Sequence, residues 1–248
     1  MVTSSKLVYD EIAPYYASYI HTRKAYMAAV DAKIISRINH GGTSIDILDV
    51  GSGDGLRSKE IISSLNVTPR LTQLDESEEM FRHGKTGRGA PVTQVVGDIC
   101  RPPDSLATYD IVMALFNVFG HILPESRRLQ ALRSIHKLLR PDSVFIFDIS
   151  NRYNAAEYGW GTVLRNVATD SFDRGPNRGN HTYRLSVADG VAPLCTCHFF
   201  RPREADRLLR QAGFEIVEKQ YLNYRTGQRE SLPWRGQLLY VARPVTTS

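Results

Sequence analysis

ILDVGSGDG, residues 47–55, is the stretch that decides the fold of this chain. The apolar run that leads into it, Ile45–Val50, predicts a buried strand, and three glycines follow it at once. Glycine lets the main chain take positive φ angles and lets a ligand approach closely. Because the pattern after Gly55 is helical, the stretch predicts a strand, a tight turn and a helix N-terminus. Such a turn can hold a nucleotide-like ligand.

The composition is that of a globular protein. The 248 residues, with 42% hydrophobic and 23% charged, suit one large α/β domain or one domain with an insertion. No stretch approaches the ~18 apolar residues of a membrane span, and the N-terminus lacks the apolar segment of a signal peptide. Three cysteines do not suit a disulfide framework. We therefore expect a cytoplasmic protein that makes no membrane contact.

The positive charge permits an acidic partner without requiring one. The net charge is +5, and the basic residues are spread along the chain with a mild excess in the last fifty residues. A nucleic-acid-binding protein more often concentrates them on one face or in one run. A solvated basic surface is therefore the favoured interpretation.

Strands and helices alternate between residues 45 and 149. The apolar patterns predict a helix over residues 23–39, further helices over 76–81 and 126–139, and strands over 45–50, 70–74, 92–96, 109–114 and 144–149. This alternation is typical of a parallel sheet with helices on both faces.

The second part of the chain departs from this rhythm. Residues 150–200 are rich in Asn, Arg, Tyr and Gly, with short antiparallel strands expected over 182–187 and 194–199. A helix over 202–212, a strand over 214–221 and a last strand over 237–242 follow. Only a loop joins those two strands, so we expect antiparallel neighbours.

The predicted fold class is α/β: a doubly wound, seven-stranded, mostly parallel sheet with an antiparallel last strand, plus a small cap insertion after strand five. We divide the chain into an N-terminal helical lid (residues 1–40), a Rossmann-like core (41–149 and 201–248) and the cap (150–200), which is part of the same domain.

The residues around the glycine turn indicate which ligand it holds. The dinucleotide fingerprint requires a glycine where this chain has Leu56, which disfavours a nucleotide-dependent reductase, and no Gly-Lys-Ser/Thr follows for a phosphate loop. Asp75 ends strand two, where a carboxylate can accept hydrogen bonds from ribose. Asp49 lies inside an apolar strand and needs a cation such as an ammonium group. Asp98 can accept from the exocyclic amine of adenine, so the three acids describe an amino-acid nucleoside.

At this point the sequence resembles the class I S-adenosylmethionine-dependent methyltransferases. The resemblance covers about residues 9–150 and the final hairpin, and it rests on motifs in the family's order: DVGSGDG (49–55), LDESEEM (74–80), GDI (97–99), YDIV (109–112), LLRP (138–141) and GFE (213–215). One departure is PDS at 141–143, where the family has Pro-Gly-Gly; Asp and Ser also form turns. The segment YDEIAPYY (9–16) is similar to the family's lid.

The resemblance implies S-adenosylmethionine as cofactor and S-adenosylhomocysteine as product. Carried over motif by motif, it assigns cofactor binding to Tyr16, Asp49, Gly51, Ser52, Gly53, Asp75, Glu76, Met80, Asp98, Ile99 and Leu115. Asp75 would bind ribose, Met80 would pack on adenine, and Tyr16 would lie near the methionine end. For Asp98 the competing interpretation is a simple turn residue.

Residues after strands four and five are candidates for the acceptor. His121 is the catalytic candidate, since a histidine can take a proton from an amine or hydroxyl nucleophile; its alternative is a packing role in the next loop. The substrate-binding candidates are Tyr15, Asn117, Asn151, Arg152, Tyr153 and His198. Arg152 can grip a carboxylate or pair with a surface acid.

No metal site is expected. Cys195 and Cys197 share one strand face with His198 pointing away, and no second cluster supplies further ligands at zinc spacing.

The predicted function is methyl transfer from S-adenosylmethionine to N or O of a small-molecule metabolite by a monomer or homodimer. Two alternatives stay open: a tRNA or rRNA methyltransferase with the same core, which requires a basic face, and a non-catalytic S-adenosylmethionine-binding protein.

Overall fold

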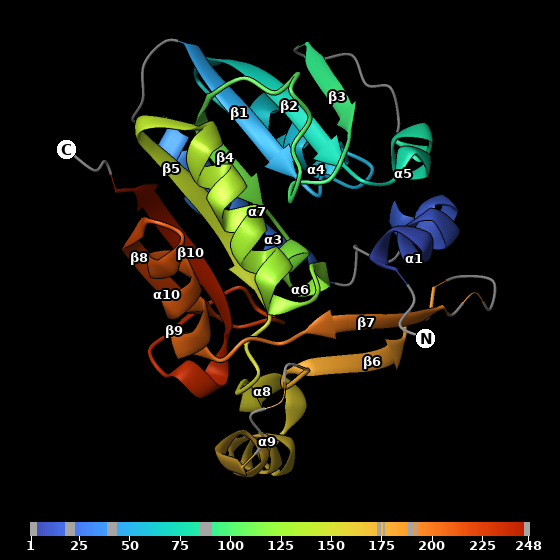
Figure 1. The fold of residues 1–248 in the computed structure, drawn as a ribbon, viewed down its shortest axis with the longest axis vertical. Coiled ribbons are helices and arrows are strands. Elements are labelled where there is room, and N and C mark those ends of the chain that lie inside the picture. The colour runs from blue at the N-terminus through green and yellow to red at the C-terminus, as the bar shows by residue number, and fades with distance from the viewer. Residues whose placement is uncertain are drawn as a thin grey trace.

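An eight-stranded sheet runs through the centre of the molecule in the computed structural model (Figure 1). The structure describes residues 4–17, 23–38, 44–84, 91–172, 175, 177–187, 191 and 193–245. The strands are β1 (Ser44–Val50), β2 (Thr68–Asp75), β3 (Val92–Val96), β4 (Tyr109–Ala114), β5 (Leu139–Ile149), β8 (Phe214–Leu222), β9 (Arg229–Glu230) and β10 (Gln237–Pro244). Their order in the sheet is β3-β2-β1-β4-β5-β10-β8-β9.

The strand directions confirm the doubly wound prediction. The first five strands are parallel, and β10 is antiparallel to both β5 and β8. The expected hairpin between the strands near 214–221 and 237–242 is therefore present. The sheet has eight strands in place of seven, because Arg229 and Glu230, expected in a loop, pair with the end of β8.

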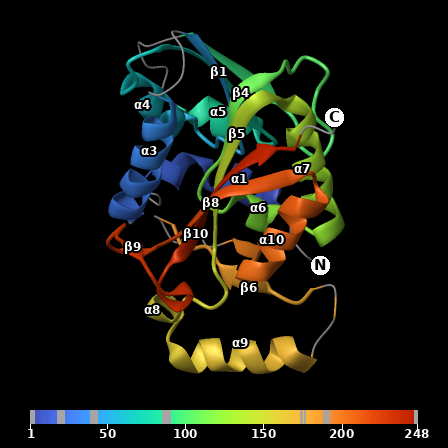
Figure 2. The ribbon, with the colours of Figure 1, turned by 90° about the vertical axis from the view of Figure 1, so that its left-hand side faces the viewer.

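Helices cover both faces of the sheet, as Figure 2 shows. On one face α3 (Lys24–Ile38) and α4 (Leu56–Ser63) bury a stripe of isoleucines against β1 and β4. On the other face lie α7 (Glu125–Leu138) and α10 (Pro202–Gln211). The short helices α5 (Glu78–His83) and α6 (Val118–His121) lie at the carboxyl ends of the strands.

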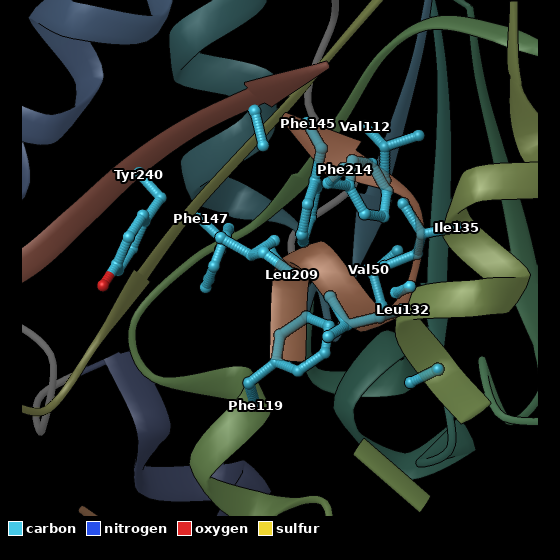
Figure 3. Packing of buried hydrophobic residues seen from close by; sticks show 14 of the residues in the cluster. Val50, Val112, Phe119, Leu132, Ile135, Phe145, Phe147, Leu209, Phe214 and Tyr240 are labelled. Atoms are coloured by element: carbon cyan, nitrogen blue, oxygen red, sulfur yellow. The ribbon is translucent and has the colours of Figure 1, made fainter. Parts of the chain in front are cut away.

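Aromatic stacking fills the layer beneath α7 and α10 (Figure 3). The rings of Phe145 and Phe147 stack with centroids 4.6 Å apart, and Phe147 stacks on Tyr240 of β10 at 5.1 Å. Phe119 of α6 packs on both phenylalanines. This packing anchors α6, which carries His121, to the strands that end beside it.

The lid and the cap meet at the carboxyl edge of the sheet. The lid contributes α1 (Ser5–Ile12) and the turn η1 (Ala13–Tyr15); residues 1–3, 18–22 and 39–40 of the predicted lid lie outside the described residues. The cap contains α8 (Ala155–Tyr158), α9 (Trp160–Phe172) and the two-stranded sheet of β6 (Asn180–Arg184) and β7 (Leu194–His198). Val8 and Ile12 of α1 pack on Leu185 and Cys195 of the cap.

The helix α9 was not among the predicted elements. An ordinary surface helix faces the core with its apolar side. In α9 the large apolar residues face outward, whereas Asn166 and Asp170 face inward. No described helix of the chain combines the length and apolar character needed to cross a membrane.

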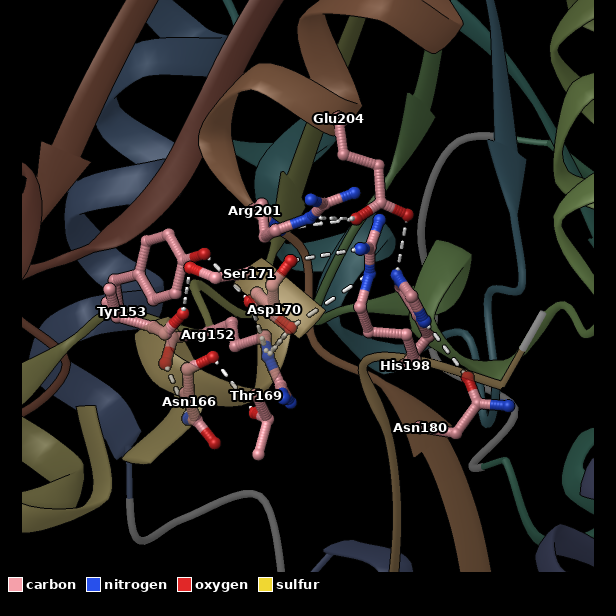
Figure 4. A network of polar contacts seen from close by, with 12 residues as sticks. Arg152, Tyr153, Asn166, Thr169, Asp170, Ser171, Asn180, His198, Arg201 and Glu204 are labelled. Atoms are coloured by element: carbon pink, nitrogen blue, oxygen red, sulfur yellow. Dashed lines mark hydrogen bonds and ion pairs between the residues drawn. The ribbon is translucent and has the colours of Figure 1, made fainter. Parts of the chain in front are cut away.

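A buried polar cluster holds α7, α10 and β7 together. Arg128 of α7 is 1% exposed, donates to the carbonyl oxygen of Ile122 and lies 3.8 Å from Glu204. Glu204 Oε1 lies 2.8 Å from His198 Nε2, whose ring contacts Asn180 through Nδ1 (Figure 4). Burial lowers the pKa of His198, although Glu204 opposes this shift.

We expect Arg128→Ala to lower the free energy of unfolding by about 3–5 kcal/mol, because it leaves Glu204 buried with a weaker set of partners. Urea denaturation followed by circular dichroism measures the change. The control is Arg207→Ala, which removes the exposed pair between Arg207 and Glu125 and should cost less than about 1 kcal/mol. An equal loss of unfolding free energy in the two variants would contradict the role of the Arg128 charge in holding the buried cluster.

Candidate active site

A cavity of about 270 Å³ opens at the carboxyl ends of β1, β2 and β4, beneath the lid and β7. Open α/β sheets bind ligands at this edge. The predicted site residues on its wall are Tyr16, Gly51, Gly53, Asp75, Glu76, Ile99, Leu115 and His121. The sheet therefore brings eight of the predicted residues into one cavity.

The glycine turn lies against its neighbours with no room for side chains. Gly51 and Gly53 have φ angles of +65° and +59°. A Cβ atom on Gly51 would lie 2.7 Å from the methyl carbons of Val118, and one on Gly53 would lie 3.1 Å from Met80. The backbone itself therefore forms this part of the wall, where a ligand can approach it closely. Met80 lies behind the turn and is buried.

Asp75 is fixed by two backbone N–H groups. The amide of Gly53 donates to its Oδ2 at 2.8 Å and the amide of Ser77 donates to its Oδ1 at 2.9 Å. Burial raises the pKa of this carboxyl despite both bonds. A carboxylate that borders a cavity in this way is placed to accept from a pair of ligand hydroxyls, as ribose offers.

Asp98 does not line the described cavity, although its partner Arg127 does. Its Oδ1 accepts from the amide of Cys100 and its Oδ2 accepts from Arg127 at 2.6 Å. Among the described residues, Gly97, Ile99 and Arg127 line the cavity at this point and Asp98 does not. Its carboxylate therefore shapes the turn and holds Arg127 there.

Asp49 and Ser52 line a smaller cavity of about 30 Å³ that shares Tyr16, Gly51 and Leu115 with the larger one. Burial raises the pKa of Asp49 to about 7. Arg57 also borders this space, pairing with Asp31 at 2.8 Å.

Two buried polar atoms of this smaller cavity lack a hydrogen bond in the described structure: Ser52 Oγ and Arg57 Nη1. Buried polar groups are rarely left without a partner. One carboxylate together with one unused guanidinium N–H and one hydroxyl fits the ammonium and carboxylate of an amino acid. The donor set therefore fits the methionine end of S-adenosylmethionine.

His121 joins the core, the lid and the cap. Its Nε2 lies 3.1 Å from the hydroxyl of Tyr9 on α1, and its Nδ1 lies 3.8 Å from the thiol of Cys195 on β7. The Tyr9 ring also meets the His121 and Tyr16 rings edge to face. Burial lowers the pKa of His121 to about 4, so the imidazole is neutral near pH 7.

Three of the residues predicted to bind the methyl acceptor lie outside the cavity wall and make hydrogen bonds or ion pairs within the protein. Arg152 pairs with Asp170 of α9 at 3.1 Å, and Tyr153 donates to the same carboxylate (Figure 4). His198 lies in the buried cluster with Glu204. Arg152 thus binds an acid, as the alternative interpretation had it, and that acid is buried.

The other three predicted acceptor residues also lie outside the described cavity wall. Asn151 donates to the carbonyl oxygens of Pro233 and Gly236, and Asn117 accepts from the amide of Ser150. Tyr15 belongs to the turn η1. The side chains of Asn151 and Asn117 bond to backbone groups of distant segments, and spacing in the sequence does not distinguish such bonds from ligand binding.

The sequence interpretation missed Tyr9, Arg57 and Thr196 as site residues. Thr196 lies on the cavity wall from β7, and Arg57 follows the glycine turn on α4. Tyr9 stood in the recognised lid segment, but its spacing gave no signal that its hydroxyl reaches a histidine 112 positions away. Arg57 had a weak signal, since a charged residue in the first turn after the glycines lies near the ligand.

Residues 47–142 match a protein family described as a methyltransferase domain. The matched segment contains β1 to β4 and the glycine turn. A curated relative, an uncharacterised protein of Methanocaldococcus jannaschii, is 26% identical over 217 residues, which are 86% of this chain and 76% of the relative.

Three solved structures have the same fold. A complex described as DhpI-SAM-HEP is 21% identical, with 98% of this chain and 100% of that chain covered and a TM-score of 0.65. A putative methyltransferase of Haloferax volcanii, solved with the Trm112 methyltransferase activator, is 16% identical (97% and 99% covered, TM-score 0.65). SAM-bound CalS10, an amino pentose methyltransferase of Micromonospora echinaspora, is 17% identical (93% and 96% covered, TM-score 0.59).

Cofactor affinity should rise with pH if Asp49 meets the ligand's ammonium group. The raised pKa leaves Asp49 largely protonated below about pH 7, and the ammonium needs the ionised form. We expect calorimetry to give about tenfold weaker binding of S-adenosylmethionine near pH 6 than near pH 8. Asp49→Asn should bind weakly at both values. A wild type without this dependence would contradict the placement.

Proposed function

We propose that this chain, whose residues 47–142 match a methyltransferase domain, is a class I S-adenosylmethionine-dependent methyltransferase that methylates a nitrogen or oxygen of a small-molecule metabolite. The observation that carries the proposal is the cavity at the strand ends, which the glycine turn of the core lines together with Tyr9, His121 and Thr196 from three different segments. The acceptor would occupy the side formed by the lid and β7, next to the methyl group.

The cofactor would span both cavities. Asp75 would accept from its ribose hydroxyls, and Gly97 and Ile99 would border its adenine. Asp49, Ser52 and Arg57 would hold its amino-acid end, with Asp49 opposite the ammonium and Arg57 opposite the carboxylate. The charges are complementary in that order, and the orphaned atoms of Ser52 and Arg57 support it.

The methyl transfer needs little general acid–base catalysis. S-adenosylmethionine would supply a sulfonium methyl that is already activated: the acceptor lone pair would bond to the methyl carbon as its bond to sulfur breaks, with S-adenosylhomocysteine as the leaving product. A hydroxyl acceptor would pass its proton to His121, directly or through Tyr9. The lining residues then provide in-line positioning and exclude water. His121, neutral near pH 7, would accept a hydrogen bond directly or through Tyr9 and so orient the acceptor. An amine acceptor would carry its proton away on the product.

Several features favour a small acceptor over RNA. The cavity is bordered by the lid and by Thr196 of the cap, and many basic side chains already face acids: Arg37 with Glu218, Arg140 with Asp46, Arg207 with Glu125 and Arg243 with Glu215. Such pairing leaves less positive charge for a phosphate backbone. CalS10, with the same fold, is described as an amino pentose methyltransferase.

The cofactor assignment is tested by calorimetry with S-adenosylmethionine and S-adenosylhomocysteine. We expect Asp75→Ala to weaken binding by at least about a hundredfold, because it removes the ribose acceptor and loosens the Gly53 amide. The matched control is Asp104→Ala, at an exposed position outside the cavity wall, which should bind as the wild type does. Undiminished binding by Asp75→Ala would overturn the ribose role.

The acceptor assignment is tested with a panel of small amines and hydroxyl compounds, and with bulk tRNA and rRNA, by following S-adenosylhomocysteine release. We expect turnover with a small compound, and we expect Tyr9→Phe to lower kcat about 10- to 100-fold at unchanged cofactor affinity. His121→Gln, which keeps a hydrogen-bonding group, should lose less than His121→Ala. Methylation of RNA alone would overturn the small-molecule proposal.

A further inference from the structure

The outward face of the cap helix α9 is a continuous apolar stripe. Trp160 is 57% exposed, Leu164 64%, Val167 46% and Phe172 88%. At about 100° per residue, these four and Gly161, Ala168 and Ser171 fall within one arc of roughly 140° on the helix surface. No charged residue of the described α9 lies inside that arc, and Arg165 lies beside it.

The stripe continues beyond the helix. Trp234 of η4 (Pro233–Arg235) lies 6.2 Å from Trp160 between ring centroids and is 39% exposed, and Leu232 beside it is 40% exposed. Figures 1 and 2 show α9 at the end of the molecule remote from β1–β3, with its outer side facing solvent. We call the surface of Trp160, Leu164, Val167, Phe172 and Trp234 the α9 patch.

The α9 patch is not needed to hold α9 in place. The opposite side of the helix carries the buried residues Val163 and Asn166, and Asn166 donates to the carbonyl oxygen of Arg152. Asp170 on the same side accepts from Arg152 and Tyr153. The helix is thus anchored by polar bonds on one side, while its larger apolar side chains face outward.

The size of the α9 patch matches one side of a protein–protein interface. An aromatic side chain carries about 150–250 Å² of surface, so the three rings with Leu164, Val167 and Leu232 expose on the order of 600–700 Å². The largest apolar patch of a monomer is typically about 300–600 Å², and a stable interface buries about 800 Å² on each partner.

We propose that a second copy of this chain covers the α9 patch, with the two α9 helices packed antiparallel across a two-fold axis. In a two-fold interface the same surface must be complementary to itself. The sequence of α9 has this property when the pairing is centred beside Asn166. Trp160 then faces Phe172 of the second copy at both ends, Leu164 faces Ala168, and Gly161 faces Ser171.

This register places large residues opposite small ones and aromatic rings opposite each other. Small residues at 161 and 168 allow the helices to approach closely, and antiparallel helix dipoles attract one another. The arc itself carries no charge, although the same register sets Arg165, at the edge of the arc, opposite Val167 of the second copy. The two active-site cavities, which open beneath α1 and β7, would stay outside the contact.

The oligomeric state tests the proposal. Sedimentation velocity over a wide concentration range should show the wild type at twice the 27.9 kDa of one chain. Leu164→Glu should raise the dimer Kd by at least about a hundredfold, because two carboxylates would be desolvated against apolar side chains. The control Leu7→Glu changes a leucine of similar exposure on α1 and should remain dimeric. A wild type that is monomeric throughout overturns the proposal.

The register has its own test. A chain carrying Leu164→Cys is mixed with a chain carrying Ala168→Cys and oxidised; the three native cysteines are buried. The mixed disulfide should form faster than either self-crosslink. Crosslinking without this preference overturns the antiparallel register. Flotation of wild-type monomer with phosphatidylglycerol vesicles, lost in Leu164→Glu, would instead assign the α9 patch to a lipid surface and overturn the dimer.

Discussion

The close approach of the glycine turn to its neighbours is the constraint on which the rest of the site depends. Gly51 and Gly53 leave no space for a Cβ between the turn and Val118 and Met80. Because the backbone of the turn forms the wall, the amide of Gly53 can donate a hydrogen bond to the Asp75 carboxylate, with 2.8 Å between the nitrogen and Oδ2. A side chain at Gly51 would clash with Val118, and one at Gly53 would press on Met80 and Tyr16.

Buried carboxylates hold the loops that follow the strands of the sheet. Asp148 accepts from the amide of Phe116 at 2.7 Å and from the hydroxyl of Tyr26 at 2.8 Å, and so joins β5, the loop after β4 and α3. Phe116 and Asn117 have φ angles of +64°, which Asn tolerates but which are costly for the bulky side chain of Phe116. The bonds to Asp148 and Ser150 hold this strained segment in place, and it carries the start of α6 toward His121.

The sequence predicted the core well because its signals are local. The apolar run between Pro91 and Gly97 placed β3 at its observed limits, and the apolar run over 109–114 did the same for β4. The missing crossover helix predicted that β8 and β10 are antiparallel. The motifs at the ends of successive strands led to residues that now line one cavity. Asn151, Arg152 and His198 lie outside it, because the folded chain uses their polar side chains for internal bonds. Their partners lie up to 85 positions away, and no spacing rule identifies such partners. The helix α9 escaped prediction because its polar side is the buried one.

The lid helix α1 contacts both the cap and the core. Its buried side chains Val8 and Ile12 pack on the cap, whereas Asp10 accepts from Ser77 Oγ of the core at 2.5 Å and Tyr9 reaches His121. Moving α1 away from the cavity must break both sets of contacts together. We therefore expect α1 to open as one unit that leaves the core and the cap in a single step.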